Sequence, residues 1–108
     1  WCAAVLHGRS VVVFGGRDAN LGAANTTEVL DLDAGTTGTS MAGPTMATAR
    51  AGCAAVRLDA RRVLLVGGSA DARFPVASFD TTEILDLETM RFSAGPRMLS
   101  KRSYCTAI

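Results

Sequence analysis

Hydrophobic residues in this chain form short runs, and two of these runs each end on a pair of glycines. The runs are residues 11–14, which precede Gly15 and Gly16, and residues 63–66, which precede Gly67 and Gly68. A continuous apolar run of this length is typical of a strand that is buried on both faces. Paired glycines then permit a sharp turn or the close approach of another backbone.

The two runs belong to an internal repeat. The double glycines, the Gly-Pro pairs at residues 43–44 and 95–96, and Arg50 with Arg102 all recur 52 residues apart. The motif Thr-Thr-Glu recurs at residues 26–28 and 81–83 with three extra residues, which fall in a segment between apolar runs, where loops tolerate insertion. We therefore divide the chain into a first repeat at 1–52, a second repeat at 53–102, and the beginning of a third at 103–108.

Each repeat contains four segments with the character of β-strands, and no helical period is visible. In the second repeat the predicted strands are residues 53–58, 63–66, 81–87 and 91–94. In the first repeat the third and fourth predicted strands are residues 26–32 and 37–41. Four-stranded units at a period of about 50 residues are typical of β-propeller blades.

These motifs make the chain similar to two kelch repeats. The matching residues are Arg50-Ala51-Gly52-Cys53 before the first strand, Gly67-Gly68 after the second, and Glu83-Ile84-Leu85-Asp86 on the third. The resemblance implies an all-β fold, with two four-stranded antiparallel β-propeller blades and the first strand of a third, all part of a kelch propeller. The positions expected to be structural are Gly15, Gly16, Gly67, Gly68, Glu28, Glu83, Asp31 and Asp86.

A propeller closes with about 4 to 8 blades, so two blades leave apolar faces to be covered. We expect the chain, which begins at Trp1, to be a fragment of a longer propeller whose remaining blades cover these faces. The alternative is that further copies of the chain close a ring together.

Composition excludes several classes of partner. The chain is 48% hydrophobic and 19% charged with a formal net charge of +1, and its charges are scattered, so no basic stripe for nucleic acid is present. No apolar run approaches the roughly 20 residues that span a membrane. The three cysteines are an odd number, and no signal peptide pattern is visible. These features do not assign the protein to one cellular compartment, although they slightly favour the cytoplasm.

Two arginines are candidate contacts for a partner. Arg50 and Arg102 each precede the first strand of a repeat, on the face that also carries the connection between the second and third strands. The resemblance to kelch proteins implies that rim arginines on this face grip acidic peptides. The alternative is a structural ion pair inside the blade with Glu28 or Glu83, which enter the third strand from the same face.

The two connections between second and third strands differ in length and sequence while the flanking strands match. Such divergence on a repeated frame is where binding specificity is expected. The polar and aromatic candidates in these connections are Arg17, Asp18, Asn20, Arg73 and Phe74.

No motif indicates catalysis, a metal or a cofactor. The cysteines share one repeat position, which favours packing over a thiolate site, and the glycine pairs lack the spacing of a phosphate loop. We therefore expect an interaction scaffold that binds a protein or peptide. The alternative is the non-catalytic portion of a propeller enzyme of the galactose-oxidase or sugar-acid epimerase type. A copper-radical site would need His and Tyr ligands, and the chain offers only His7 and Tyr104.

Overall fold

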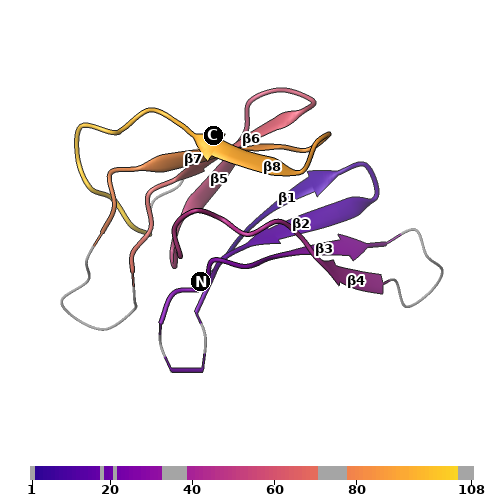
Figure 1. Ribbon diagram of the computed structural model, residues 1–108, viewed down its shortest axis with the longest axis horizontal. Coiled ribbons are helices and arrows are strands. Elements are labelled where there is room, and N and C mark those ends of the chain that lie inside the picture. The colour runs from indigo at the N-terminus through magenta and orange to yellow at the C-terminus, as the bar shows by residue number, and fades with distance from the viewer. Residues whose placement is uncertain (1, 18, 21, 33–38, 71–77, 105–108) are drawn as a thin grey trace.

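Each repeat folds into one four-stranded antiparallel sheet (Figure 1). A computed structural model describes residues 2–17, 19–20, 22–32, 39–70 and 78–104. The strands are β1 (Ala3–His7), β2 (Ser10–Phe14), β3 (Thr27–Asp31), β4 (Thr39–Ala42), β5 (Ala54–Arg57), β6 (Arg62–Val66), β7 (Thr82–Asp86) and β8 (Arg91–Ala94). Within these described ranges the chain forms no helix that could cross a membrane.

The strand order confirms the predicted all-β fold of two blades. One sheet has the order β1-β2-β3-β4 and the other has the order β5-β6-β7-β8. The register is also repeated, because Val13 lies opposite Glu28 in the first sheet and Leu65 lies opposite Glu83 in the second. The three inserted residues therefore leave the strand pairing unchanged. We call the two sheets blade 1 and blade 2.

The core lies between the blades, and the alternation of side chains along each strand decides what enters it. Val12 and Phe14 of β2 are buried on the face that blade 1 turns toward blade 2. Val63 and Leu65 of β6 are buried on the opposing face of blade 2. At the repeat offset of 52, Val12 and Phe14 correspond to Leu64 and Val66, so the buried pair of β6 lies one position earlier in the repeat. The two blades therefore bury opposite faces, as expected when two like sheets stack in the same orientation. The ring of Phe14 meets that of Phe92 edge to face, with centroids 6.4 Å apart.

The double glycines receive the segment that closes each blade. The amide of Gly16 donates to the carbonyl of Arg50 at 3.0 Å, and the amide of Gly68 donates to the carbonyl of Arg102 at 2.8 Å. A Cβ atom on Gly67 would collide with that same Arg102 carbonyl oxygen. Gly67 also has a φ of 65°, which L side chains rarely adopt. Close approach of another backbone is thus the reason for the glycine pair.

The predicted start of a third blade is described only at Ser103 and Tyr104, which form no strand; residues 105–108 lie outside the described residues. The cysteine positions are not equivalent in their surroundings. Cys53 is buried, as packing predicts, whereas Cys2 is exposed, so the packing explanation is wrong for Cys2. Cys2 precedes the first strand of blade 1, a blade that is covered on one side only.

Candidate functional site: a recess at the junction of the blades

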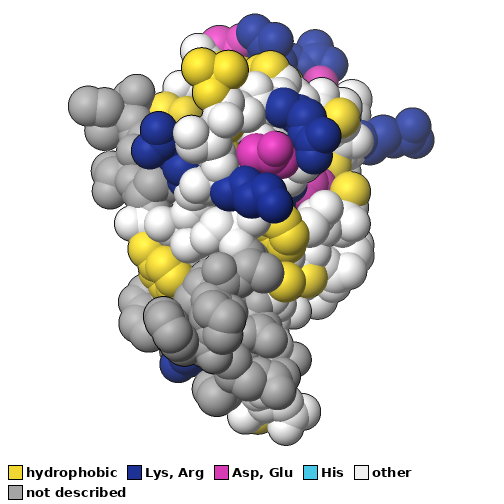
Figure 2. All heavy atoms as spheres, turned by 90° about the vertical axis from the view of Figure 1, so that its left-hand side faces the viewer, with side chains coloured by type: hydrophobic (Ala, Val, Ile, Leu, Met, Phe, Trp, Pro, Cys, Tyr) yellow, Lys and Arg dark blue, Asp and Glu magenta, His cyan; other side chains and the backbone are white. Residues whose placement is uncertain are grey.

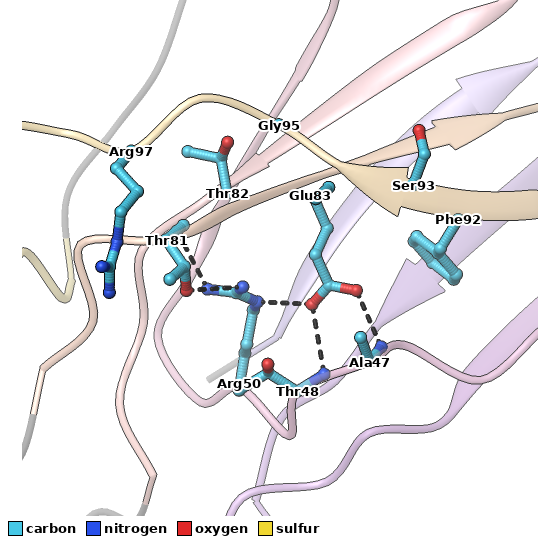
Figure 3. Close-up of a pocket in the computed structure, with 11 residues that line it drawn as sticks. Ala47, Thr48, Arg50, Thr81, Thr82, Glu83, Phe92, Ser93, Gly95 and Arg97 are labelled. Atoms are coloured by element: carbon cyan, nitrogen blue, oxygen red, sulfur yellow. Dashed lines mark hydrogen bonds and ion pairs between the residues drawn. The ribbon is translucent and has the colours of Figure 1, made fainter.

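The side chain of Arg50 crosses from blade 1 to blade 2 and is held there by several acceptors (Figure 3). Its Nε atom donates to Oε2 of Glu83 at 2.9 Å. Its two terminal nitrogens donate to the carbonyl of Gly67 at 2.6 Å and to the Thr81 hydroxyl at 2.9 Å. All three nitrogens of the guanidinium therefore have partners on blade 2.

Both oxygens of the Glu83 carboxylate also accept hydrogen bonds. Besides Arg50, it accepts a hydrogen bond from the amide of Ala47 at 2.7 Å and another from the amide of Thr48 at 3.3 Å. Glu83 is the second residue of β7, the third strand of blade 2, whereas Ala47 and Thr48 lie in the segment that closes blade 1. The carboxylate thus bonds both the side chain and the backbone of the neighbouring blade.

Burial makes this ion pair a structural one. The side chains of Arg50 and Glu83 are 1% and 5% exposed, and the guanidinium also lies 5.5 Å from the ring centre of Phe79. The expectation that Arg50 is an exposed rim contact is therefore corrected, because its guanidinium is buried and saturated with acceptors. The alternative of an ion pair inside one blade is corrected as well, since the pair joins two blades.

A recess of about 410 Å³ opens beside this ion pair. Figure 3 shows its walls, which come from the start of β7, the end of β8 and the closing segment of blade 1. Phe92 and Ala94 contribute apolar surface, and Ser93 contributes a hydroxyl. Arg97 stands at one side, with its side chain 73% exposed and one nitrogen 3.1 Å from Asp80. Among the described residues, the recess therefore combines apolar walls with an accessible arginine.

The other predicted site residues do not line this recess where the structure describes them. Arg102 and Glu28 are exposed, as are Arg17 and Asn20 in the connection between β2 and β3. Asp18, Arg73 and Phe74 lie outside the described residues. Sequence reasoning missed Arg97. The signal for it was the divergence of the repeats, because residue 45, its counterpart 52 positions earlier, is Thr.

The structural role expected of Asp86 is visible at the opposite end of blade 2. Desolvation opposes ionisation of Asp86, but hydrogen bonds from the amides of Glu88 and Thr89 and from Arg61 outweigh it and lower the pKa of this carboxyl. Asp59, in the turn between β5 and β6, has its pKa lowered by the amide of Arg61 first and then by the side chain and amide of Arg62. Asp31 occupies the position of Asp86 in the first repeat.

No group of three or more His, Cys, Asp and Glu side chains is placed to hold a metal among the residues that the structure describes.

Comparison with known proteins supports the fold. No known family profile matches the chain. The chain is 38% identical over 88 residues to acyl-CoA-binding domain-containing protein 5 of Arabidopsis thaliana. The matched region covers 82% of the chain but only 13% of that protein. The chain is thus much shorter than this relative.

Two solved structures superpose closely on the chain. A fungal alcohol oxidase of the AA5 family, in complex with copper, has a TM-score of 0.81 at 16% identity, covering 94% of this chain and 23% of its own. YjhT has a TM-score of 0.77 at 12% identity, covering 97% of this chain and 34% of its own. Both are β-propeller proteins, and the two sheets have the arrangement of adjacent propeller blades. At this level of identity the likeness concerns the fold alone.

Proposed function

We propose that the chain is a portion of a kelch-type propeller that acts as an interaction scaffold, binding a protein or peptide partner rather than catalysing a reaction. Support for the kelch assignment comes from the double glycines and from the Glu-Ile-Leu-Asp motif on the third strand. The residues of these motifs make specific contacts. The backbone of Arg102 approaches Gly67 and Gly68 closely, and Glu83 accepts a hydrogen bond from Ala47 of the neighbouring blade.

The observation that carries the binding proposal is the recess between the blades. It lies where β7 begins, at the end of blade 2 that the β6–β7 connection enters, and the sequences of the two repeats diverge in this connection and in its β2–β3 counterpart. Sequence divergence on a repeated frame is typical of a recognition surface. A recess of about 410 Å³ accommodates one or two side chains of a partner rather than a whole domain.

The chemistry of the recess favours a partner that carries a carboxylate beside a small apolar side chain. Phe92 and Ala94 offer apolar contact, and Arg97 offers a guanidinium that is 73% exposed and, among the described residues, is paired with the half-buried Asp80. Ion pairs at the protein surface contribute about 0–1 kcal/mol, and the guanidinium of this pair is exposed, so a partner carboxylate can exchange for Asp80 at little cost. Lys101, on the same closing segment, is exposed and adds positive charge. Figure 2 shows one face of the molecule on which Lys and Arg side chains gather around a few Asp and Glu side chains.

The proposal is tested by selecting binders from a random dodecapeptide library against the 108-residue chain. We expect the selected peptides to be enriched in Asp and Glu. A fluorescein-labelled selected peptide should bind Arg97→Ala about 3- to 30-fold more weakly than the wild type, the loss expected for one partly exposed charge contact.

The matched control is Arg62→Ala. Arg62 is also an exposed arginine paired with an aspartate, but it begins β6 at the opposite end of blade 2. Equal affinities of the two variants for the peptide, or selection of peptides with no acidic residue, would exclude the recess as the binding site.

A further inference from the structure

The outer strand of blade 2 has a free edge. β8 pairs with β7 alone, so its other edge has no strand beside it among the residues that the structure describes. Stacking of a neighbouring blade does not cover such an edge. β4, the outer strand of blade 1, is exposed at all four of its residues although blade 2 packs against the same blade. Blades therefore meet through their faces, and a further blade stacked in this way leaves the edge of β8 open.

The pairing with β7 decides which backbone groups of β8 point to this edge. The amide of Gly95 donates to the carbonyl of Thr82 at 3.1 Å. Hydrogen-bonded pairs alternate along an antiparallel ladder, so every second residue of β8, counted back from Gly95, bonds β7. The residues between them, Phe92 and Ala94, point their amides and carbonyls toward the free edge. A row of unpaired donors and acceptors is a template for another strand.

The side chains of the same two residues face the recess. The ring of Phe92 meets that of Phe14 on blade 1, so this side of β8 is turned toward the neighbouring blade. Ala94 lies two residues further along and has its side chain on the same face. Both line the recess, and Figure 3 shows the ring of Phe92 at its wall. A residue of an added strand that lies directly opposite either one points its side chain to the same face, and hence toward the recess.

Arginines flank this edge in the second repeat, whereas the first repeat has threonines there. Arg91 begins β8 and is exposed, and Arg97 follows the end of β8 with a side chain that is 73% exposed. The positions 52 residues earlier are Thr39 and Thr45. The edge of β8 therefore carries positive charge at both of its ends, and the edge of β4 does not. This difference favours an acidic segment as the occupant of the β8 edge.

We propose that the partner binds as an added strand, pairing its backbone with the free edge of β8 and placing a side-chain carboxylate in the recess beside Arg97. This inference rests on the proposed function and adds the conformation of the partner to it. Hydrogen bonds to the backbone of Phe92 and Ala94 supply affinity, and the recess supplies selectivity for alternate side chains. β8 has four residues, so at about 3.3 Å per residue the paired stretch is about 13 Å long. The partner segment is thus extended and acidic, and about four or five of its residues make the contact.

The test begins with the wild-type chain and the fluorescein-labelled peptide that is selected against it. Each backbone amide of the peptide is N-methylated in turn, and the affinity is measured by fluorescence anisotropy. In an added strand every second amide points to β8, so we expect N-methylation to weaken binding about tenfold at alternate positions and to have little effect between them. Losses that do not alternate along the peptide would overturn strand addition.

A proline at position 94 tests the same contact from the side of the protein. Ala94→Pro removes an amide that points to the free edge, and no hydrogen bond to β7 is lost with it, so an edge strand tolerates the change. We expect this variant to bind the peptide at least about tenfold more weakly than the wild type. The matched control is Ala42→Pro, the same substitution at the equivalent position of β4, and it should bind like the wild type. Urea unfolding of both variants checks that the blades stay folded.

The outcomes separate this inference from the proposed function. An affinity that falls in Arg97→Ala but is the same in Ala94→Pro and Ala42→Pro would keep the recess as a binding site and overturn strand addition. A selection without acidic peptides, or an affinity that Arg97→Ala leaves unchanged, would overturn the proposed function and this inference with it. If Ala94→Pro does not fold, the N-methylation series on the wild type decides between the outcomes.

Discussion

Replacement of Arg50 by Met is the most direct test of how the blades are held together. The substitution keeps an unbranched side chain as far as the position of Nε but removes the guanidinium, with its charge and every donor. Glu83 then stays buried with its ionic partner gone, and the Gly67 carbonyl loses a 2.6 Å hydrogen bond. Breaking a buried ion pair by removing one member costs about 3–5 kcal/mol.

The expected loss lies toward the lower end of this range. Glu83 keeps the two amide hydrogen bonds from Ala47 and Thr48, which continue to stabilise its negative charge. We therefore expect Arg50→Met to lower the free energy of unfolding by about 3 kcal/mol. With a urea slope of about 1–3 kcal/mol/M, the midpoint of urea unfolding falls by about 1–3 M.

Two further variants separate the ion pair from simple loss of packing. Arg50→Lys keeps the charge but not the planar group that reaches several acceptors, so its loss should be intermediate. The double variant Arg50→Met/Glu83→Leu removes both charges and should be more stable than Arg50→Met alone, since no buried carboxylate is left unpaired.

The matched control is Arg62→Met, because the Arg62–Asp59 pair has a similar 2.8 Å distance but side chains that are 52% and 45% exposed. Its loss should be about 0–1 kcal/mol. If urea unfolding followed by circular dichroism gives equal losses for Arg50→Met and Arg62→Met, the buried pair does not hold the blades together.

Three other predictions concern single positions. Gly67→Ala should destabilise the protein by clearly more than Gly8→Ala in urea unfolding, because both glycines have positive φ but only at Gly67 would a Cβ meet backbone; equal losses would contradict the close-approach explanation. The lowered pKa of Asp59 means that its stabilising effect is complete above its unfolded pKa of about 3.9 and is lost as pH falls through the lowered value. Asp59→Asn should therefore reduce the difference in urea midpoint between pH 7 and pH 3, and an unchanged difference would exclude this contribution. Thiol labelling followed by peptide mass mapping should modify Cys2 rapidly and Cys53 only on unfolding; rapid native labelling of Cys53 would contradict its burial.

Much of the fold was predictable because the repeat encodes it locally. The apolar runs before the glycine pairs predicted β2 and β6, and the Thr-Thr-Glu motifs predicted the start of β3 and β7. Strand identity depends on neighbouring residues in the sequence, so two copies of one pattern give the same result twice. The fourth strand of the first repeat, predicted at residues 37–41, is described as β4 at Thr39–Ala42 and so ends one residue later than predicted, because its weak apolar pattern does not define its end; residues 37 and 38 lie outside the described residues.

The ion pair shows where sequence reasoning stops. A pairing of Arg50 with a glutamate was foreseen as one alternative, but a single repeat contains both an arginine and a glutamate, and the spacing of residues does not say which copies meet. The structure shows the arginine of the first repeat bonded to the glutamate of the second. Arg97 escaped notice for a related reason, since only the stacking of the blades creates the recess beside it.

The sequence by itself determined the strands, their order within each blade and the number of complete blades, because periodic burial and turn residues act over a few positions. Only the tertiary structure decided which face of each blade is covered, which ionisable groups are buried, and where a partner side chain fits. These properties arise between repeats of nearly the same sequence. They depend on how the two blades stack, so identical residues such as Glu28 and Glu83 have different surroundings and different roles.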